Sequence, residues 1–463
     1  MAKKGKTVFV CQECGYESPK WLGQCICGAW GSFVEEKVIE PDDAGSGRRT
    51  VGAAPGERIK ATPLKKVGSA DYSRIKTGIA ELDRVLGGGL VKGSLVLISG
   101  EPGIGKSTLI IQAAANIARD CGRVLYVSGE ESGEQIKMRA DRVCGDFSER
   151  LFVLSETNME NVEAVCDEID PEFVIIDSIQ TMYTREMDSA PGSVSQVRGC
   201  GNLLMRLGKK CGIPVFIVAH VTKSGELAGP KIVEHLVDCV LSFTGERDND
   251  LRILRAYKNR FGTTSEIGAF RMEEEGLIEI PNLSEIFVEG TCGKPEGSVV
   301  TAVYEGSRPV MFEIQALTAS ANVGFARRTA VGIDSQRLSM LLAVLEKKAG
   351  IPMMNSDVYV NVAGGVRPDG TAVDLAVVLA IFSSYRGIAS DRRLIAVGEV
   401  GLTGGIRPVS GADKIAIEAK RMGYEEMILP ARDAEKLKGE KRLTGLKLTG
   451  VKTVSDAIRA FKD

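Results

Sequence analysis

The sequence of 463 residues contains no apolar run that approaches the length of a membrane-spanning helix. Its basic N-terminus is followed by only three apolar residues, 8–10, which are too few for the core of a signal peptide. These absences argue against both a membrane protein and a secreted protein. We therefore expect a cytoplasmic protein without a membrane partner, in which the 11 cysteines remain reduced.

The sequence also lacks an excess of positive charge. Its 59 lysines and arginines are balanced by 61 acidic residues, which gives a net charge of −2. Any contact with nucleic acid must therefore come from local patches. A hydrophobic content of 44% is ordinary for a globular protein, and a chain of this length is expected to form two or three domains.

Histidine is scarce, since the chain has only His220 and His235, and neither lies near the N-terminus. A metal ion there must be held by cysteines, of which four fall within seventeen residues: Cys11, Cys14, Cys25 and Cys27. Four thiolates predict a closed, structural Zn²⁺ site. The second pair is CxC in place of CxxC, so weakened metal binding is the alternative. Nearby aromatic residues are expected to pack around the site, with base stacking as the alternative: Trp21, Trp30 and Phe33.

Composition predicts an α/β protein of four segments. Residues 1–36 form the four-Cys zinc knuckle, and residues 37–66 are a linker rich in Gly, Pro and charge. In residues 67–282 and again in 283–463, apolar strands alternate with helices, the first set as in a mainly parallel sheet. The expected strands are 95–98, 124–127, 173–176, 215–218, 239–243, 298–304, 358–362, 395–397 and 427–429, and the later helices are 338–348, 372–383 and 413–422.

A glycine-rich motif follows the first strand of the third segment. It comprises Gly100, Glu101, Pro102, Gly103, Ile104, Gly105, Lys106 and Ser107, with Thr108 opening the next helix. Strand, glycine-rich loop and helix are the context of a phosphate loop that binds ATP. We expect Lys106 to neutralise the β- and γ-phosphates and Ser107 to ligate Mg²⁺.

Three further polar positions follow apolar strands at the same expected sheet edge. Asp177 ends a run of four apolar residues and is a second candidate ligand for Mg²⁺. Glu130 is the candidate general base for hydrolysis and Glu131 is its alternative. His220 could sense the γ-phosphate, although a lone histidine is often only structural.

A compact basic pentapeptide comprises Lys258, Asn259, Arg260, Phe261 and Gly262. Two cations around a short polar turn suit a phosphate that is reached from a neighbouring subunit, as an arginine finger does. The alternative is an exposed basic hairpin.

This pentapeptide, the phosphate loop and residues 77–83, 174–182 and 220–230 resemble the bacterial RadA (Sms) family over essentially the whole chain. The resemblance implies a RecA-like ATPase core that assembles into a homohexamer around DNA. It implies a DNA-dependent ATPase of helicase type and unknown polarity, which drives branch migration of recombination intermediates beside RecA. Its partners are expected to be single-stranded and branched DNA. Lys258 and Arg260 are expected to act at a neighbour's ATP or to couple its state to DNA.

The resemblance to RecA-like cores also implies two DNA-binding loops, at residues 184–198 and 223–231. Their cations are Arg185, Arg198, Lys223 and Lys231, which could contact phosphates. The alternative for both segments is an ordinary surface loop.

The C-terminal segment, from about residue 286, resembles the protease domain of Lon. The position of the nucleophilic serine is Ala372, and the position of the catalytic lysine is Asp413, with Lys414 one residue later. Because alanine has no nucleophile, we expect a scaffold without proteolytic activity. Paired arginines could give it a DNA-contacting surface, although such pairs are often simply solvated: Arg327, Arg328, Arg392 and Arg393.

Two functions from other classes remain as alternatives. A KaiC-like regulatory ATPase that acts on a protein partner would fit the paired Glu130 and Glu131, but the knuckle and the pentapeptide argue against it. An ATP-dependent protease is opposed by Ala372.

Overall fold

The structure is a computed structural model that describes residues 6–11, 16–38, 74–220, 232–245, 250–288, 295–321, 326–365, 368, 370–390 and 392–462. The chain separates into two units, Met1–Ile280 and Pro281–Asp463. The division falls two residues before the boundary expected after residue 282. All but the first two residues of the expected linker 37–66 lie outside the described residues.

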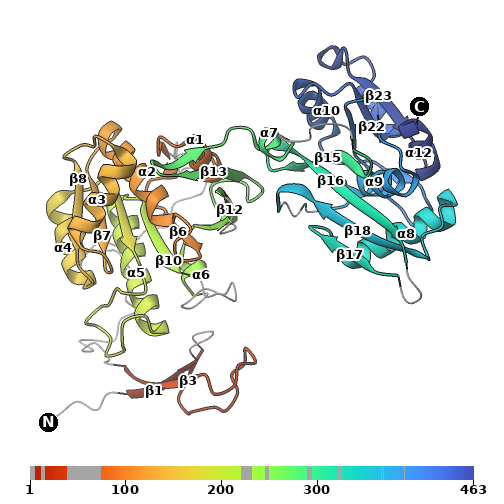
Figure 1. Cartoon of the computed structure of the whole chain (residues 1–463). Coiled ribbons are helices and arrows are strands. Elements are labelled where there is room, and N and C mark those ends of the chain that lie inside the picture. The colour runs from red at the N-terminus through yellow and green to blue at the C-terminus, as the bar shows by residue number, and fades with distance from the viewer. Residues whose placement is uncertain are drawn as a thin grey trace, which may run out of the picture. The chain divides into compact units, whose positions relative to one another are not determined.

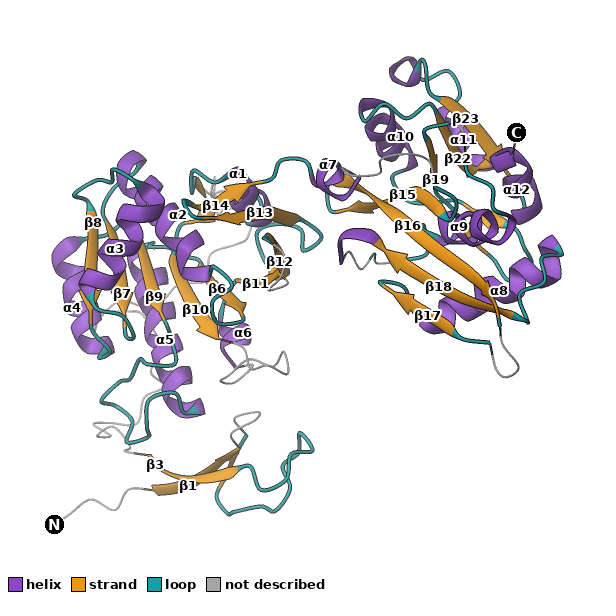
Figure 2. Cartoon of the chain, viewed as in Figure 1, coloured by secondary structure: helices purple, strands orange, loops and turns teal. Residues whose placement is uncertain are grey.

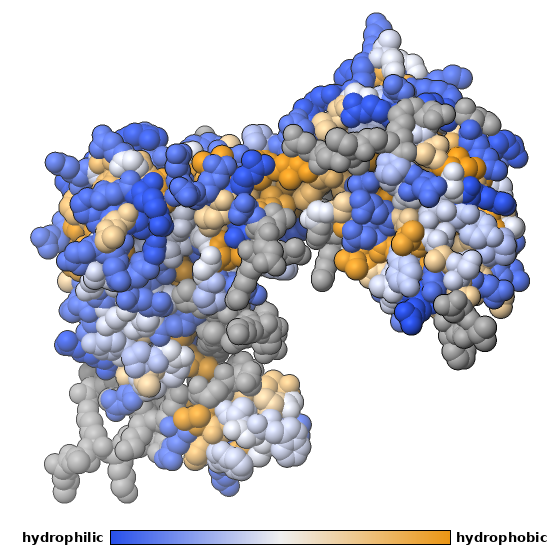
Figure 3. All heavy atoms as spheres, in the orientation of Figure 1, coloured by the Kyte–Doolittle hydropathy of each residue, from blue (hydrophilic) through white to orange (hydrophobic). Residues whose placement is uncertain are grey.

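The N-terminal ribbon is a three-stranded antiparallel sheet of order β2-β1-β3 (Figure 1). Its strands are β1 (Lys6–Cys11), β2 (Glu17–Ser18) and β3 (Phe33–Val38). Phe33 packs with Cys11 and Cys25 in a small core, as expected. The expected packing of Trp21 and Trp30 is wrong, since they are 56% and 77% exposed. A core this small has no room for two indole rings, and apolar residues reach the ribbon's surface (Figure 3).

The ATPase domain is built on a nine-stranded sheet of order β14-β13-β12-β11-β6-β10-β9-β7-β8. The six strands from β11 to β8 in this order are parallel to one another. The strands β12, β13 and β14 are added to β11 in turn, each antiparallel to the strand before it. Their bounds are β6 (Leu95–Gly100), β7 (Val124–Ser128), β8 (Leu151–Ser155), β9 (Phe173–Asp177), β10 (Val215–His220), β11 (Cys239–Gly245), β12 (Leu251–Asn259), β13 (Ile267–Glu273) and β14 (Gly276–Glu279). The mainly parallel sheet is therefore confirmed.

Helices cover both faces of this sheet (Figure 2). They are α1 (Ala80–Val85), α2 (Lys106–Asp120), α3 (Gly133–Cys144), α4 (Met159–Ile169), α5 (Val194–Cys211) and α6 (Ile232–Leu236). One hydrophobic cluster joins the sheet to α1, α2 and α3, and a second joins the other face to α4, α5 and α6. Because alternate residues of each buried strand serve the two clusters, these strands read as continuous apolar runs. A short hairpin pairs β4 (Arg74–Ile75) with β5 (Leu90–Val91).

The C-terminal unit holds a seven-stranded mixed sheet of order β17-β18-β16-β15-β19-β22-β23. The strands are β15 (Ser298–Glu305), β16 (Arg308–Ser320), β17 (Arg328–Val331), β18 (Ser356–Val362), β19 (Leu394–Ala396), β22 (Glu426–Pro430) and β23 (Lys447–Val451), with a separate pair β20 (Glu399–Val400) and β21 (Ile406–Arg407). The helices are α7 (Leu283–Val288), α8 (Ser335–Ala349), α9 (Asp374–Arg386), α10 (Ala412–Arg421), α11 (Ala431–Leu437) and α12 (Val454–Lys462). Among the described residues, no helix has the length and apolar character needed to cross a bilayer.

Candidate ATP site and metal centre

The phosphate loop connects the end of β6 at Gly100 to the start of α2 at Lys106. Gly103 and Gly105 have φ angles of +78° and +111°, which favour glycine. A Cβ at Gly105 would lie 2.4 Å from Cε of Met272, and a Cβ at Gly100 would lie 2.5 Å from the carbonyl oxygen of Phe243. The close backbone of β11 at Gly100 and the positive φ of Gly105 therefore require glycine at both ends of the loop.

Lys106 is buried at the base of the loop, where its Nζ donates to the carbonyl oxygens of Gly100 at 2.8 Å and Glu101 at 3.0 Å. Burial lowers the pKa of Lys106 to about 8, and the negative charges of Asp177 and Glu130 oppose this shift. The lysine is thus a partly desolvated cation beside two carboxylates. A cation in this setting is strongly attracted to a phosphate group, because little water screens the interaction.

Asp177 is the centre of a cluster of oxygen atoms at the carboxyl edge of the sheet. The Ser107 hydroxyl donates to Oδ2 of Asp177 at 2.8 Å, and the Tyr126 hydroxyl donates to the same atom at 2.5 Å. Burial and then the charge of Asp177 raise the pKa of Tyr126. A carboxylate next to a serine hydroxyl is a ligand set of the kind that Mg²⁺ prefers, so these residues fit that ion.

Tyr126 is a site residue that the sequence analysis missed. It lies inside the apolar strand β7, where a tyrosine is easily taken for an ordinary core side chain. Because β7 pairs with β9, its hydroxyl reaches the carboxylate that ends β9. The signal was a tyrosine hydroxyl in a fully buried strand, which must find a polar partner.

The two adjacent glutamates after β7 have different partners. Glu130 accepts a hydrogen bond of 2.5 Å from the Ser178 hydroxyl, next to Asp177, and its charge acts on Lys106. Glu131 forms an ion pair of 2.5 Å with Arg139 of α3. The geometry therefore directs Glu130 toward the ATP site and Glu131 toward a helix.

Three of the residues expected to contact ATP or DNA lie at or beyond the limits of the described residues. The backbone of His220 pairs with Gly100, so the end of β10 lies directly beside the phosphate loop. Its side chain, together with Lys223 and Lys231, falls outside what the structure describes.

The segment after β9 is a shorter loop than expected, because α5 begins at Val194 and places Arg198 on a helix. Ser193 caps this helix by accepting from the N–H of Gln196. The buried Gln196 amide in turn donates to the carbonyls of Thr184, Met187 and Ser189, which ties the loop to the helix. Arg185 and Arg198 are both exposed.

The basic pentapeptide lies near the amino ends of the parallel strands, whereas the chain's own phosphate loop follows the carboxyl end of β6. β12 is antiparallel to β11, so Asn259 pairs with Cys239, which is level with Val96 near the start of β6. Gly100 lies four residues further along β6, which is about 13 Å at 3.3 Å per residue.

The two cations of the pentapeptide are anchored to α6 and to the short segment that follows it before β11. Nζ of Lys258 donates to the carbonyl oxygen of Glu234 at 2.7 Å, and Arg260 forms an ion pair of 3.1 Å with the buried Asp238. The Arg260 side chain is nevertheless 55% exposed. Burial, and then the nearby Arg260, lower the pKa of Lys258. Both cations are thus held in place while Arg260 stays accessible.

The other residues of the pentapeptide fix its backbone. Asn259 donates from its amide to the carbonyl of Val85, and the carbonyl of Phe261 accepts from Arg74 at 2.7 Å. A Cβ on Gly262 would lie 2.9 Å from Cα of Gly87, so only glycine permits this approach of two backbones.

Three of the four predicted metal ligands lie together in the ribbon. The sulfur atoms of Cys11, Cys25 and Cys27 all lie within 4.8 Å of one another, and Cys14 is outside the described residues. Sγ of Cys11 is 3.9 Å from Sγ of Cys27. Tetrahedral Zn–S bonds of 2.3 Å place two sulfurs about 3.8 Å apart. Cys27 of the shortened CxC pair thus lies at a distance from Cys11 that suits two ligands of one zinc ion.

Ala372, at the position of the protease nucleophile, and its neighbour Thr371 form hydrogen bonds within the C-terminal fold. The carbonyl of Ala372 accepts from the N–H of Gly398 at 2.8 Å, and the Thr371 hydroxyl donates to Glu399 at 3.0 Å. Lys414 contacts Tyr304, whose ring centroid lies 4.6 Å from its Nζ.

The arginine pairs of this unit differ in their surroundings. Arg392 pairs with the buried Glu426, and Arg393 stacks on the ring of Tyr424, so both serve the fold. Arg327 and Arg328 are exposed.

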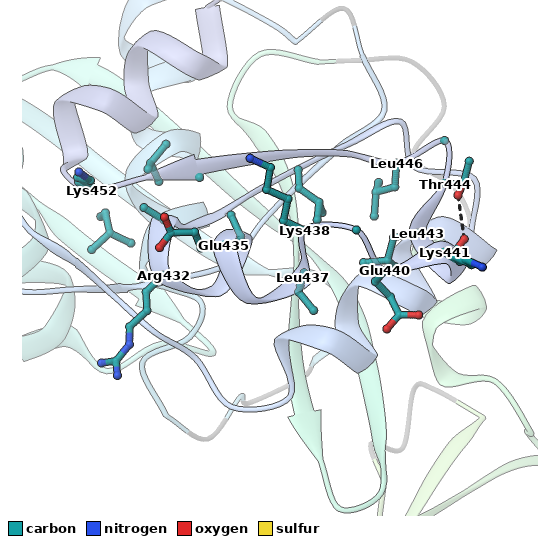
Figure 4. Close-up of a pocket in the computed structure, with 18 residues that line it drawn as sticks. Arg432, Glu435, Leu437, Lys438, Glu440, Lys441, Leu443, Thr444, Leu446 and Lys452 are labelled. Atoms are coloured by element: carbon teal, nitrogen blue, oxygen red, sulfur yellow. Dashed lines mark hydrogen bonds between the residues drawn. The ribbon is translucent and has the colours of Figure 1, made fainter.

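A large hollow of about 930 Å³ lies in the C-terminal unit beside α11 and β23. Figure 4 shows that its charged side chains do not converge, since Arg432 and Lys438 extend in different directions. The residues of the ATP site take no part in its lining.

Three segments of the chain match known protein families. Residues 9–35 match the rubredoxin metal binding domain, residues 60–226 match the AAA domain, and residues 315–433 match subunit ChlI of Mg-chelatase. Fold and site together define an ATPase with an N-terminal zinc ribbon, a RecA-like P-loop core and a Lon-protease-like C-terminal domain. The predicted fold class is confirmed.

Similarity to curated proteins extends over the full chain. It is 49% identical to the DNA repair protein RadA of Bacillus subtilis (strain 168), over 98% of both chains. It is 50% and 47% identical to those of Halalkalibacterium halodurans and Listeria monocytogenes, over 99% of both chains in each case. The crystal structure of the RadB recombinase aligns with 44% of this chain and 99% of its own, at 21% identity and a TM-score of 0.36. The chain belongs to the DNA repair protein RadA family.

The Tyr126→Phe variant tests the oxygen cluster around Asp177. Removing one hydroxyl leaves the buried ring in place but takes away a hydrogen bond that orients the carboxylate. Loss of such an outer partner weakens metal binding about 10- to 100-fold. We therefore expect ATP hydrolysis to require about tenfold more Mg²⁺ for half-maximal rate, as measured by magnesium titration. An unchanged magnesium requirement in a folded variant would remove Tyr126 from the site.

Proposed function

We propose that the protein is a DNA-dependent ATPase of helicase type that drives branch migration of recombination intermediates in homologous recombination and DNA repair. Its partners in this proposal are single-stranded and branched DNA and the RecA recombinase. Membership of the DNA repair protein RadA family supports the proposal. The match of residues 60–226, which include the phosphate loop, to the AAA domain supports ATP hydrolysis as the source of energy for this activity.

One observation carries the proposed assembly, namely that Lys258 and Arg260 lie at the sheet edge opposite the chain's own phosphate loop. Cations at that edge suit the ATP of an adjacent subunit. Repetition of one such head-to-tail contact closes a ring, which supports a homohexamer with ATP between neighbours.

The proposed ATP site uses residues 100–108 and the adjoining strand ends. Backbone N–H groups of the loop bind the phosphates, and Lys106 neutralises their charge. Ser107 and Asp177 hold Mg²⁺, which when bound neutralises charge on the β- and γ-phosphate oxygens. Glu130 acts as the base that orients and deprotonates water. His220 remains the proposed γ-phosphate sensor because its backbone adjoins Gly100.

The proposed zinc site uses Cys11, Cys14, Cys25 and Cys27, and the clustered sulfurs support it. Four thiolate ligands leave no open coordination position, so the metal is structural and stabilises the ribbon.

The proposed DNA contacts are Arg185 and Arg198, which the structure describes, and Lys223 and Lys231, which lie outside the described residues. The exposure of the two arginines, after the strand that ends at Asp177, supports contact with DNA phosphates.

A comparison of Glu130→Gln with Glu131→Gln tests the choice of base. Loss of the base should lower kcat about 10²- to 10⁴-fold while ATP binding is kept. Glu131→Gln retains a side chain that can accept from Arg139, so it should lower kcat less than tenfold. ATP turnover and nucleotide binding are measured for both variants. Equal losses, or a larger loss for Glu131→Gln, would contradict the assignment.

Mixed rings test the proposal that Arg260 acts on a neighbour. Lys106→Ala removes ATP binding in its own subunit, and Arg260→Ala removes the cation offered to the adjacent one. In rings mixed one to one, about a quarter of sites combine an intact phosphate loop with a neighbour's intact Arg260. Two variants with little activity alone should therefore recover about a quarter of the wild-type DNA-stimulated ATPase rate when mixed. The control is a ring formed only from the variant that carries both Lys106→Ala and Arg260→Ala, which has no complete site. No recovery in mixed rings of demonstrated composition would place Arg260 outside the neighbour's site.

A further inference from the structure

Arg252 on β12 is buried behind the phosphate loop and contacts the loop's backbone. The residue is buried, with 8% of its surface exposed. Its Nε donates to the carbonyl oxygen of Ile104 at 3.2 Å, and an Nη donates to the carbonyl of Leu251 at 3.0 Å. A guanidinium group thus joins the antiparallel edge of the sheet to the loop.

The contact fixes the orientation of one peptide unit. The carbonyl of Ile104 and the N–H of Gly105 belong to the same planar trans peptide, so they point in opposite directions. A carbonyl held on the β12 side therefore directs the Gly105 N–H to the other side of the loop. Loop N–H groups are the donors that bind phosphate in this type of site.

The same peptide is confined by the neighbouring strands. A Cβ at Gly105 would lie 2.4 Å from Met272 of β13 and 3.4 Å from Phe243 of β11. These apolar contacts limit the position of the peptide, and the hydrogen bond from Arg252 holds its carbonyl on the β12 side.

Gly245 leaves the space through which Arg252 reaches the loop. It is the residue that pairs with Arg252 across β11 and β12. A Cβ at this position would lie 2.6 Å from Cδ of Arg252 and 2.8 Å from the carbonyl oxygen of Leu251. An alanine here would displace the arginine side chain without removing its charge.

We propose that Arg252 is a positioning residue for the ATP site, which holds the Ile104–Gly105 peptide with its N–H directed at the triphosphate. The inference rests on the proposed function, because it assumes that residues 100–108 bind ATP. It predicts an effect on nucleotide affinity through the backbone, without direct contact between the guanidinium and the reacting atoms.

Equilibrium binding of a fluorescent ATP analogue, together with kcat at saturating ATP, tests this role in the full-length protein. Arg252→Met keeps the length of the side chain but has no donor. We expect its Kd for the analogue to rise about 10- to 100-fold, the usual effect of losing a charged hydrogen bond, while kcat at saturation stays within about threefold of wild type. Arg252→Lys, which keeps a cationic donor, should recover part of the affinity. The control is Arg271→Met, an exposed arginine of β13 that should bind as wild type.

Gly245→Ala provides a second test that keeps the arginine. It should reproduce the weaker binding, and circular dichroism and thermal unfolding of each variant show whether it is folded. If Arg252→Met does not fold, Gly245→Ala and Arg252→Lys decide the question. Folded variants that bind the analogue as tightly as wild type would overturn the proposal. Failure of the wild type itself to bind ATP would instead overturn the proposed function.

Discussion

The pairing of antiparallel β12 with parallel β11 is the constraint on which the rest of the ATPase domain depends. Parallel strands bring Gly100, Ser128, Asp177 and the backbone of His220 to one edge of the sheet. The chain then reverses, so one strand contacts the phosphate loop at its start and carries the basic pentapeptide at its end. Lys258 and Arg260 therefore lie toward the end of the strands that is opposite to the phosphate loop of the same chain.

The polar residues of the ATP site are held by burial and by one another. Lys106, Asp177 and Tyr126 are all buried, and each would be costly to enclose without a partner. Asp177 accepts from both Ser107 and Tyr126, and Lys106 donates to the loop's carbonyls. Because little water enters this cluster, its charges act strongly on a bound phosphate. The same burial lowers the pKa of Lys106 to about 8.

Much of this arrangement could be predicted from the sequence, because buried parallel strands leave continuous apolar runs. The five strands predicted in the ATPase domain are all present in the sheet. Among the strands that were missed, β8, β12 and β16 have partly exposed or alternating patterns that resemble surface segments. The phosphate loop needs no tertiary information, since strand, loop and helix are local in the chain.

Features that depend on packing could not be predicted. Glu130 and Glu131 are chemically identical, and only their tertiary partners, Ser178 for Glu130 and Arg139 for Glu131, distinguish them. The contacts of Tyr126 with Asp177 and of Arg252 with Ile104 join segments that are far apart in the sequence. The expectation that Trp21 and Trp30 pack in the ribbon was wrong because its core is too small, which composition does not reveal.

The measurement that tests the central claim most directly is strand displacement from a synthetic three-stranded branched DNA in the presence of ATP and Mg²⁺. Wild-type protein and the Lys106→Ala variant are compared at equal concentration, with ATP hydrolysis followed in the same reactions. The proposed motor predicts displacement by the wild type alone, with hydrolysis that rises when DNA is added. Hydrolysis that is indifferent to DNA, with no strand displaced, would contradict the account and point to an ATPase that acts on a protein.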